Sequence, residues 1–182
     1  MTRRLTTAAI IAAVAAVYLL RLDHAAGLYV DDAWYIVLAK ALAGGDGYRL
    51  ISSAATPILP AFPPGFALLL SPVFAIHPSY PGNLLWLKAV SIAAMLGVGI
   101  VTYLYLLRYR STAAPHAAAV AVITALTPAF VFLATSTVMA ECAFTLAQLA
   151  TALFGRIRIR RVLSFALTFC RMCSRSVTSS SF

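Results

Sequence analysis

The chain has 182 residues, of which 62% are hydrophobic and 10% charged, and its mean hydropathy is +0.92. A soluble domain of this length could not cover so much apolar surface with so few charges, so the composition predicts a protein largely surrounded by lipid. The net charge of +9 does not indicate nucleic-acid binding. Residues 1–155 carry eight basic and five acidic side chains (+3), whereas residues 156–182 carry six arginines and no acid (+6).

Long apolar runs without period-two alternation predict an all-α protein rather than a β-barrel. The first run, residues 5–22, follows Arg3 and Arg4 and is long enough to cross a membrane. A cleaved signal peptide is the alternative, but no clear small-residue cleavage site follows the run. We therefore expect a retained signal anchor with the N-terminus in the cytoplasm.

Residues 23–83 are predicted to form an external loop that carries interfacial helices. A helix is expected over residues 31–43, with Asp31 or Asp32 as its N-cap and Gly44-Gly45 at its C-terminal end. Its Trp34, Tyr35, Leu38 and Leu42 share a stripe, which suits a helix lying at the membrane surface.

The segment 57–78 contains six prolines, and its apolar run is short for a membrane span. The Pro63-Pro64 pair predicts the start of a re-entrant or interfacial helix, because proline fits the first turn of a helix. A true span over residues 64–77 is the competing interpretation, and it would invert the orientation of everything that follows.

Three further spans are predicted at residues 84–107, 117–137 and 141–155. Lys88 lies near the start of the first of these and is expected to reach toward the membrane surface. With four spans, the arginines at 3–4, 108–110 and 156–161 fall on one side and the acidic loop on the other, as the positive-inside rule requires.

The tail, residues 156–182, differs in composition from the body, since alanine almost vanishes and Arg, Ser and Cys replace it. A shifted reading frame would produce such a change; an ordinary basic cytoplasmic tail is the alternative. Cys170 and Cys173 form a C-x-x-C without a second cysteine pair or histidine cluster, so no metal or redox site is predicted there.

Asp31 and Asp32 are the most informative pair, since a carboxylate beside a membrane can act as a general base or bind a cation. Capping of the helix is the simpler explanation. Glu141 is a second candidate, either facing the same cavity or serving only as a helix N-terminal charge. Lys40 and Arg49 could bind a phosphate-bearing ligand, although solvated loop charges look the same in sequence. Motifs for nucleotide binding or serine and zinc hydrolysis are absent.

The order of DDAWYIVLAKALAGGDGY, AFPPGFALLL and STVMAECAFTLAQLA resembles the N-terminal part of membrane-embedded GT-C glycosyltransferases. The closest group is the bacterial proteins similar to protein mannosyltransferases and lipid A aminoarabinose transferases. The resemblance covers about residues 5–155. It implies a multi-pass protein of the bacterial inner membrane that takes a sugar from a polyprenyl-phosphate carrier on the non-cytoplasmic face and passes it to an acceptor hydroxyl.

By the same resemblance, Asp31 would be the general base and Asp32 would support it or orient the acceptor. Glu141 would match an acid at the start of a later span. Many relatives carry a basic residue where Phe62 stands, so contact with the carrier phosphate would fall to Arg49 or Lys40. No cofactor is required, and a divalent metal ion is compatible with the family.

Chains of this family are much longer and have more spans, so we expect a truncated GT-C fold that is inactive if it ends here. The alternative is a small helical membrane protein without catalytic activity, such as a transporter subunit or assembly partner. No acid lies near the centre of a predicted span, which disfavours a conduction role.

Overall fold

The computed structural model describes residues 2–55 and 62–155, with side chains from Ala8 onward, and all regular structure in these ranges is helical, which confirms the all-α prediction. The predictions for the tail and its C-x-x-C fall outside the described residues. The helices are α1 (Thr2–Arg21), α2 (Val30–Gly44), α3 (Pro64–Ile76), α4 (Leu84–Tyr109), α5 (Ala114–Ala125) and α6 (Pro128–Ser136), followed by a helical segment over residues 141–155.

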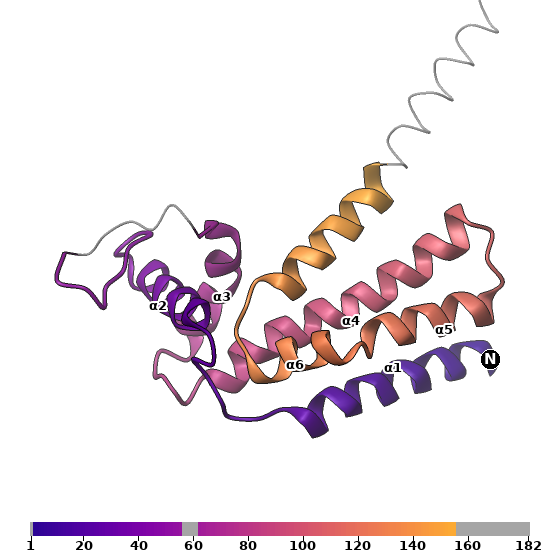
Figure 1. Cartoon of the computed structure of the whole chain (residues 1–182), viewed down its shortest axis with the longest axis horizontal. Helices are drawn as coiled ribbons and strands as arrows, with labels where there is room; N and C mark the ends of the chain where they lie inside the picture. Colours follow the sequence, from indigo (N-terminus) through magenta and orange to yellow (C-terminus); the bar gives the residue numbers. More distant parts are fainter. Residues whose placement is uncertain (1, 56–61, 156–182) are drawn as a thin grey trace, which may run out of the picture.

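The long helices run beside one another in alternating directions. Figure 1 shows α1, α4 and the α5–α6 pair aligned lengthwise, with α2 and α3 gathered at the end where α4 begins. Residues 141–155 return along α4, because Leu146 lies against Gly97 and the Tyr109 hydroxyl donates to the Leu153 carbonyl at 3.2 Å. We call the end that carries α2 and α3 the acidic end.

Two hydrophobic clusters hold this arrangement together. One lies at the acidic end, where Leu38 of α2, Leu70 of α3 and Leu87 of α4 are fully buried. The other joins the bundle through Tyr18 of α1 and Met95 of α4, which are also fully buried. The helices of the bundle therefore share one interior, and α2 and α3 have their own core on top of it.

Among the described residues, α4 is the one helix that is long and apolar enough by itself to cross a membrane. The α5–α6 pair reaches the required length together but is bent by 50°. The prediction of residues 84–107 as a span is thus supported by the length and composition of α4, and the four-span arrangement stays a prediction.

The bend between α5 and α6 was not expected, because residues 117–137 were predicted as one continuous span. Pro128 begins α6, and Thr127 before it has backbone angles outside the helical region (φ −56°, ψ 124°). A residue that precedes proline is driven out of the helical region, so the helix stops at this point. The predicted break before Glu141 is confirmed, since residues 137–140 are not helical.

Helix α2 closely matches its predicted range, and its C-terminal end is as expected. Gly45 adopts a left-handed conformation (φ 84°), its N–H bonds to the Leu42 carbonyl, and the Asp46 N–H bonds to the Ala41 carbonyl. These two bonds satisfy carbonyls that would otherwise be left open at the helix end.

The predicted N-cap of α2 was wrong. The cap is Tyr29, and no side chain makes a capping hydrogen bond. Asp31 and Asp32 lie in the first turn instead, and the Asp32 carboxylate accepts from a backbone N–H of another segment. The stripe that contains Tyr35 and Leu38 also packs into the acidic-end core rather than lying open at a membrane surface.

Helix α3 begins at the proline pair as predicted, with Pro63 as its N-cap. Its 13 residues reach only about 20 Å, whereas a hydrocarbon core is about 30 Å thick. Because α3 is too short to cross and packs against α2, the competing interpretation of a true span at residues 64–77 is not supported.

Candidate functional site

An ion pair between the buried Lys88 and the half-exposed Asp23 links the end of α1 to α4 and α6 at the acidic end. The Lys88 Nζ donates to the Asp23 carboxylate at 2.7 Å and to the Asp23 backbone carbonyl at 2.9 Å. The other carboxylate oxygen of Asp23 accepts from the Ser136 hydroxyl at 2.5 Å. Partial burial raises the pKa of Asp23, but the hydrogen bonds from Lys88, Ser136 and the Ala25 N–H together outweigh it and lower that pKa below its ordinary value.

Lys88 was expected to reach outward to the membrane surface, and this expectation was wrong. Its side chain is fully buried and turns inward, because Asp23 follows α1 directly and offers two acceptors at the right depth. A charge inside an apolar bundle is stable only when it is paired and hydrogen-bonded.

Asp32 is the buried member of the acid pair. It is 0% exposed, and its Oδ1 accepts from the Val138 N–H at 3.3 Å, across the break that follows α6. Its Oδ2 is one of three buried side-chain oxygens or nitrogens in the described residues with no hydrogen-bond partner. Burial raises the pKa of Asp32, and the nearby backbone groups of Val138 and residues 27–29 offset this only in part.

Asp31 is half-buried and lies on the open side of the first turn of α2. Burial raises the pKa of the neighbouring Tyr35, and the charges of Glu141, Tyr48 and Asp31 raise it further. The bond between Asp32 and Val138 brings Glu141, three residues after Val138, to the same end of the molecule as Asp31, although 110 residues separate the two acids in sequence. We call the group of Asp31, Asp32, Tyr35 and Glu141 the acid site.

An aromatic wall stands beside the acid site. The Phe62 ring contacts Trp34 at 6.4 Å and Tyr35 edge-on at 5.5 Å between ring centroids, and Tyr35 also meets Phe66 at 5.1 Å. The Tyr48 hydroxyl donates to the Phe62 carbonyl, which fixes the chain just before Pro63. The resemblance leads us to expect a basic residue at position 62. The Phe62 side chain found there packs against aromatic rings instead.

The structure does not bring Lys40 to the acid site. Lys40 is exposed and follows Asp31 by nine residues in the same helix, which at about 100° per residue puts it on the opposite face. Arg49 is also exposed, in the loop after Gly47. Both remain predictions for phosphate contact, and neither touches the carboxylates through any described bond.

The arrangement offers groups that can accept a proton. Within residues 2–55 and 62–155, no three His, Cys, Asp or Glu side chains lie close enough together to hold a metal ion. One exposed carboxylate, Glu141, and one half-buried carboxylate, Asp31, can each accept a proton from a hydroxyl group.

Sequence reasoning missed Asp23 and Ser136 as partners at this end of the molecule. One signal was present: a lysine in an apolar helix demands an acidic partner, and Asp23 is the acid that follows the first apolar run. No signal in the sequence could have paired Asp32 with Val138.

No family model matches the sequence, and no curated protein or solved structure is similar enough to match.

Proposed function

We propose that residues 5–155 form the N-terminal module of a membrane glycosyltransferase of the GT-C type. In this proposal a sugar passes from a polyprenyl-phosphate carrier to an acceptor hydroxyl at the acidic end of the bundle, on the non-cytoplasmic face of the bacterial inner membrane. The proposal rests on the motif resemblance and on the difference in burial between Asp31 and Asp32.

The unequal burial of the two aspartates is the structural observation that best supports the proposal. Asp32 is fully buried and bonded to the Val138 N–H, whereas the adjacent Asp31 is only half-buried. An anchored acid next to an accessible one suits a base that must be held in place while it meets a substrate, because positioned groups transfer protons most effectively.

One base is sufficient for the proposed transfer of the sugar. The acceptor O–H gives its proton to the Asp31 carboxylate, and the acceptor oxygen forms a bond to the anomeric carbon. The bond from that carbon to the phosphate oxygen breaks, and the carrier phosphate leaves with the electron pair. Asp32 keeps the first turn of α2 in place, and its own burial disfavours the charged form.

A conduction role fits the charges less well. In the described bundle helices, α4 carries Lys88 near its start and Arg108 near its end, and α5 and α6 carry no charged side chain. Lys88 is already paired with Asp23. A cation path would need acids along the helices.

Donor binding tests the proposal. Native mass spectrometry of the full chain in detergent should show binding of undecaprenyl-phosphate mannose at least about tenfold tighter than phosphatidylcholine, a difference of about 1.4 kcal/mol. Arg49→Gln should weaken this binding, and Arg110→Gln, an exposed arginine beyond the other end of α4, should not. Equal affinity for the two lipids would overturn the proposal.

A further inference from the structure

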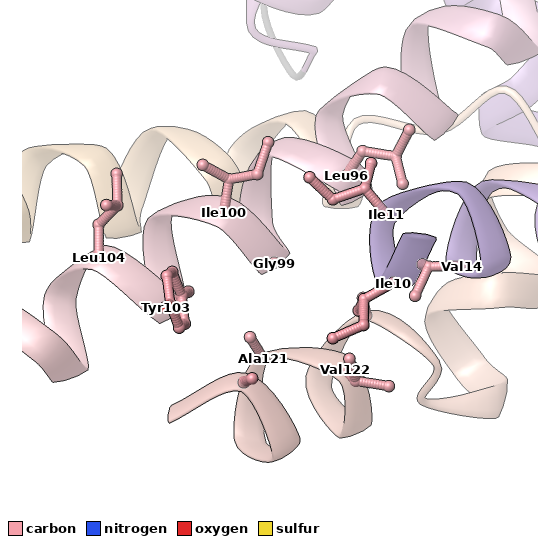
Figure 2. A pocket seen from close by; sticks show the side chains of 12 residues that line it. Ile10, Ile11, Val14, Leu96, Gly99, Ile100, Tyr103, Leu104, Ala121 and Val122 are labelled. Atoms are coloured by element: carbon pink, nitrogen blue, oxygen red, sulfur yellow. The ribbon is translucent and has the colours of Figure 1, made fainter. Parts of the chain in front are cut away.

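An apolar groove opens between α1, α4 and α5. It is lined by Ile10 and Val14 of α1, Ile100 and Tyr103 of α4, and Ala118 and Ala121 of α5, and its volume is about 320 Å³. Figure 2 shows these helices bordering a common space into which side chains from α1 and α4 project. The volume falls at the lower end of the range for ligand pockets, about 300–1,000 Å³.

The groove is separate from the acid site. The α4 residues that line the groove run from Leu96 to Leu104. Along the helix axis, they lie about 18 Å to about 30 Å from Leu84 at the acidic end. It therefore lies in the half of the bundle toward the end of α4. In the proposed function the sugar is transferred beside Asp31, at the acidic end of the molecule and away from the groove.

Positive charge lies where the groove ends. Leu96, Ile100 and Leu104 line it at intervals of four residues, and Arg108 follows Leu104 by one turn, as its neighbour on the surface of α4. Arg108 is exposed, as is Arg110 beyond it. The five described acids are located elsewhere. Asp23 and Asp32 are bonded at the acidic end, and Asp31 lies in the first turn of α2. Asp46 follows the end of α2, and Glu141 begins the segment after Val138, which is bonded to Asp32.

We propose that this groove binds one acyl chain of an anionic glycerophospholipid, with the lipid phosphate at Arg108. An open apolar groove surrounded by lipid gains dispersion contacts when a flexible hydrocarbon chain fills it. A guanidinium at its rim favours a headgroup with a net negative charge over a zwitterionic one. The inference rests on the membrane placement in the proposed function but not on the glycosyltransferase chemistry.

Tryptophan quenching by brominated lipids tests the site. The full chain, with Trp34→Phe and Trp86→Phe, receives one new tryptophan: Tyr103→Trp inside the groove, or Ile123→Trp as the control. Ile123 is a 70% exposed side chain of α5 that does not line the groove. Each protein is placed in vesicles that contain either dibromo-phosphatidylglycerol or dibromo-phosphatidylcholine at equal acyl-chain composition.

The proposal predicts that the groove tryptophan is quenched more strongly by brominated phosphatidylglycerol, with a relative affinity at least threefold higher. Arg108→Gln should abolish this preference, whereas Arg21→Gln, an exposed arginine at the C-terminal end of α1, should leave it intact. The control tryptophan should be quenched equally by both lipids.

Each other outcome overturns the proposal in a recognisable way. Equal quenching of the groove tryptophan by both lipids removes the headgroup preference. Quenching of the control tryptophan alone means that a partner helix or a second copy of the chain covers the groove. Absence of quenching at both positions contradicts membrane placement itself, and with it the proposed function.

Discussion

Lys88 and Asp23 form an ion pair of 2.7 Å across 65 residues of sequence, and the two partners differ sharply in exposure: the lysine side chain is 0% exposed and the aspartate 45%. The pair joins the end of α1 to the start of α4, and Ser136 adds the end of α6 through its 2.5 Å bond to the same carboxylate. Because of this difference in exposure, we expect substitution of the two partners to reduce the stability of the fold by different amounts.

Removing Asp23 is expected to cost more than removing Lys88. Asp23→Asn leaves a buried ammonium group without a counter-charge, and such unpaired buried charges cost about 3–5 kcal/mol. Lys88→Met leaves a half-exposed carboxylate that water can solvate, so we expect a loss of roughly 1 kcal/mol. Thermal unfolding of the purified chain in detergent measures both changes.

The double variant provides the control for this interpretation. Asp23→Asn with Lys88→Met removes the buried charge and its partner together, so it should be more stable than Asp23→Asn alone. A double variant whose loss equals the sum of the two single losses would mean that the residues do not interact in the folded protein.

The pH dependence of stability should carry opposite contributions from Asp23 and Asp32. The pKa of Asp23 is lowered, so its stabilising contribution is present above its ordinary value of 3.8 and is lost as the pH falls through the lowered pKa. The pKa of Asp32 is raised, so stability declines as the pH rises from 3.8 through the raised pKa.

Asp32→Asn isolates the second contribution, because the amide keeps an oxygen for the Val138 N–H and carries no charge. The variant should gain melting temperature relative to the wild type at pH 8 and lose that advantage near pH 4. A difference between variant and wild type that stays constant from pH 4 to pH 8 would show that Asp32 titrates as an ordinary exposed acid.

Two glycines in α4 form a matched pair for testing helix packing. A Cβ at Gly97 would meet the Leu146 side chain at 3.0 Å, whereas a Cβ at Gly99 would meet Ala125 at an ordinary 3.5 Å. Alanine favours a helix over glycine by about 1 kcal/mol. Gly99→Ala should therefore raise the unfolding free energy by up to that amount, and Gly97→Ala should raise it less or lower it. Equal effects in denaturant titrations would contradict the close contact of α4 with residues 141–155.

Asp31→Asn tests the base role. If Asp31 accepts the acceptor proton, the rate of sugar transfer should fall by about 10²–10⁴-fold. The measurement is formation of undecaprenyl phosphate from undecaprenyl-phosphate mannose in vesicles, with the substitution made in an active chain of the family's length that carries residues 1–155. Asp46→Asn, at an exposed acid just after α2, is the matched control. An unchanged rate in Asp31→Asn would remove this residue from the chemistry.

The helices were largely predictable because their signals are local. Apolar length predicted α4, the Gly44-Gly45 pair predicted the end of α2, and the Pro63-Pro64 pair predicted the start of α3. Pro128 carried an equally local signal for the bend before α6, and the uninterrupted hydrophobicity around it obscured that signal.

The sequence allowed the residues of the acid site to be predicted, but not their burial or their hydrogen bonds. The adjacent aspartates marked the region, but the burial of Asp32 and the exposure of Asp31 depend on how the break after α6 packs against α2. The pairing of Asp23 with Lys88 likewise arises from the way α1 and α4 lie side by side. Contacts across 65 or 106 residues follow from tertiary packing, which no local pattern specifies.

Cysteine labelling in intact bacterial cells tests most directly whether the acid pair lies on the non-cytoplasmic side of a membrane, as we propose. Cys142→Ala, Cys170→Ser and Cys173→Ser provide the background. Ser52→Cys reports on the acidic end and Ala113→Cys on the opposite end, since both positions are exposed. A membrane-impermeant maleimide should label position 52 in intact cells and position 113 only after lysis. Labelling of position 113 but not position 52 in intact cells would contradict this placement of the acid pair.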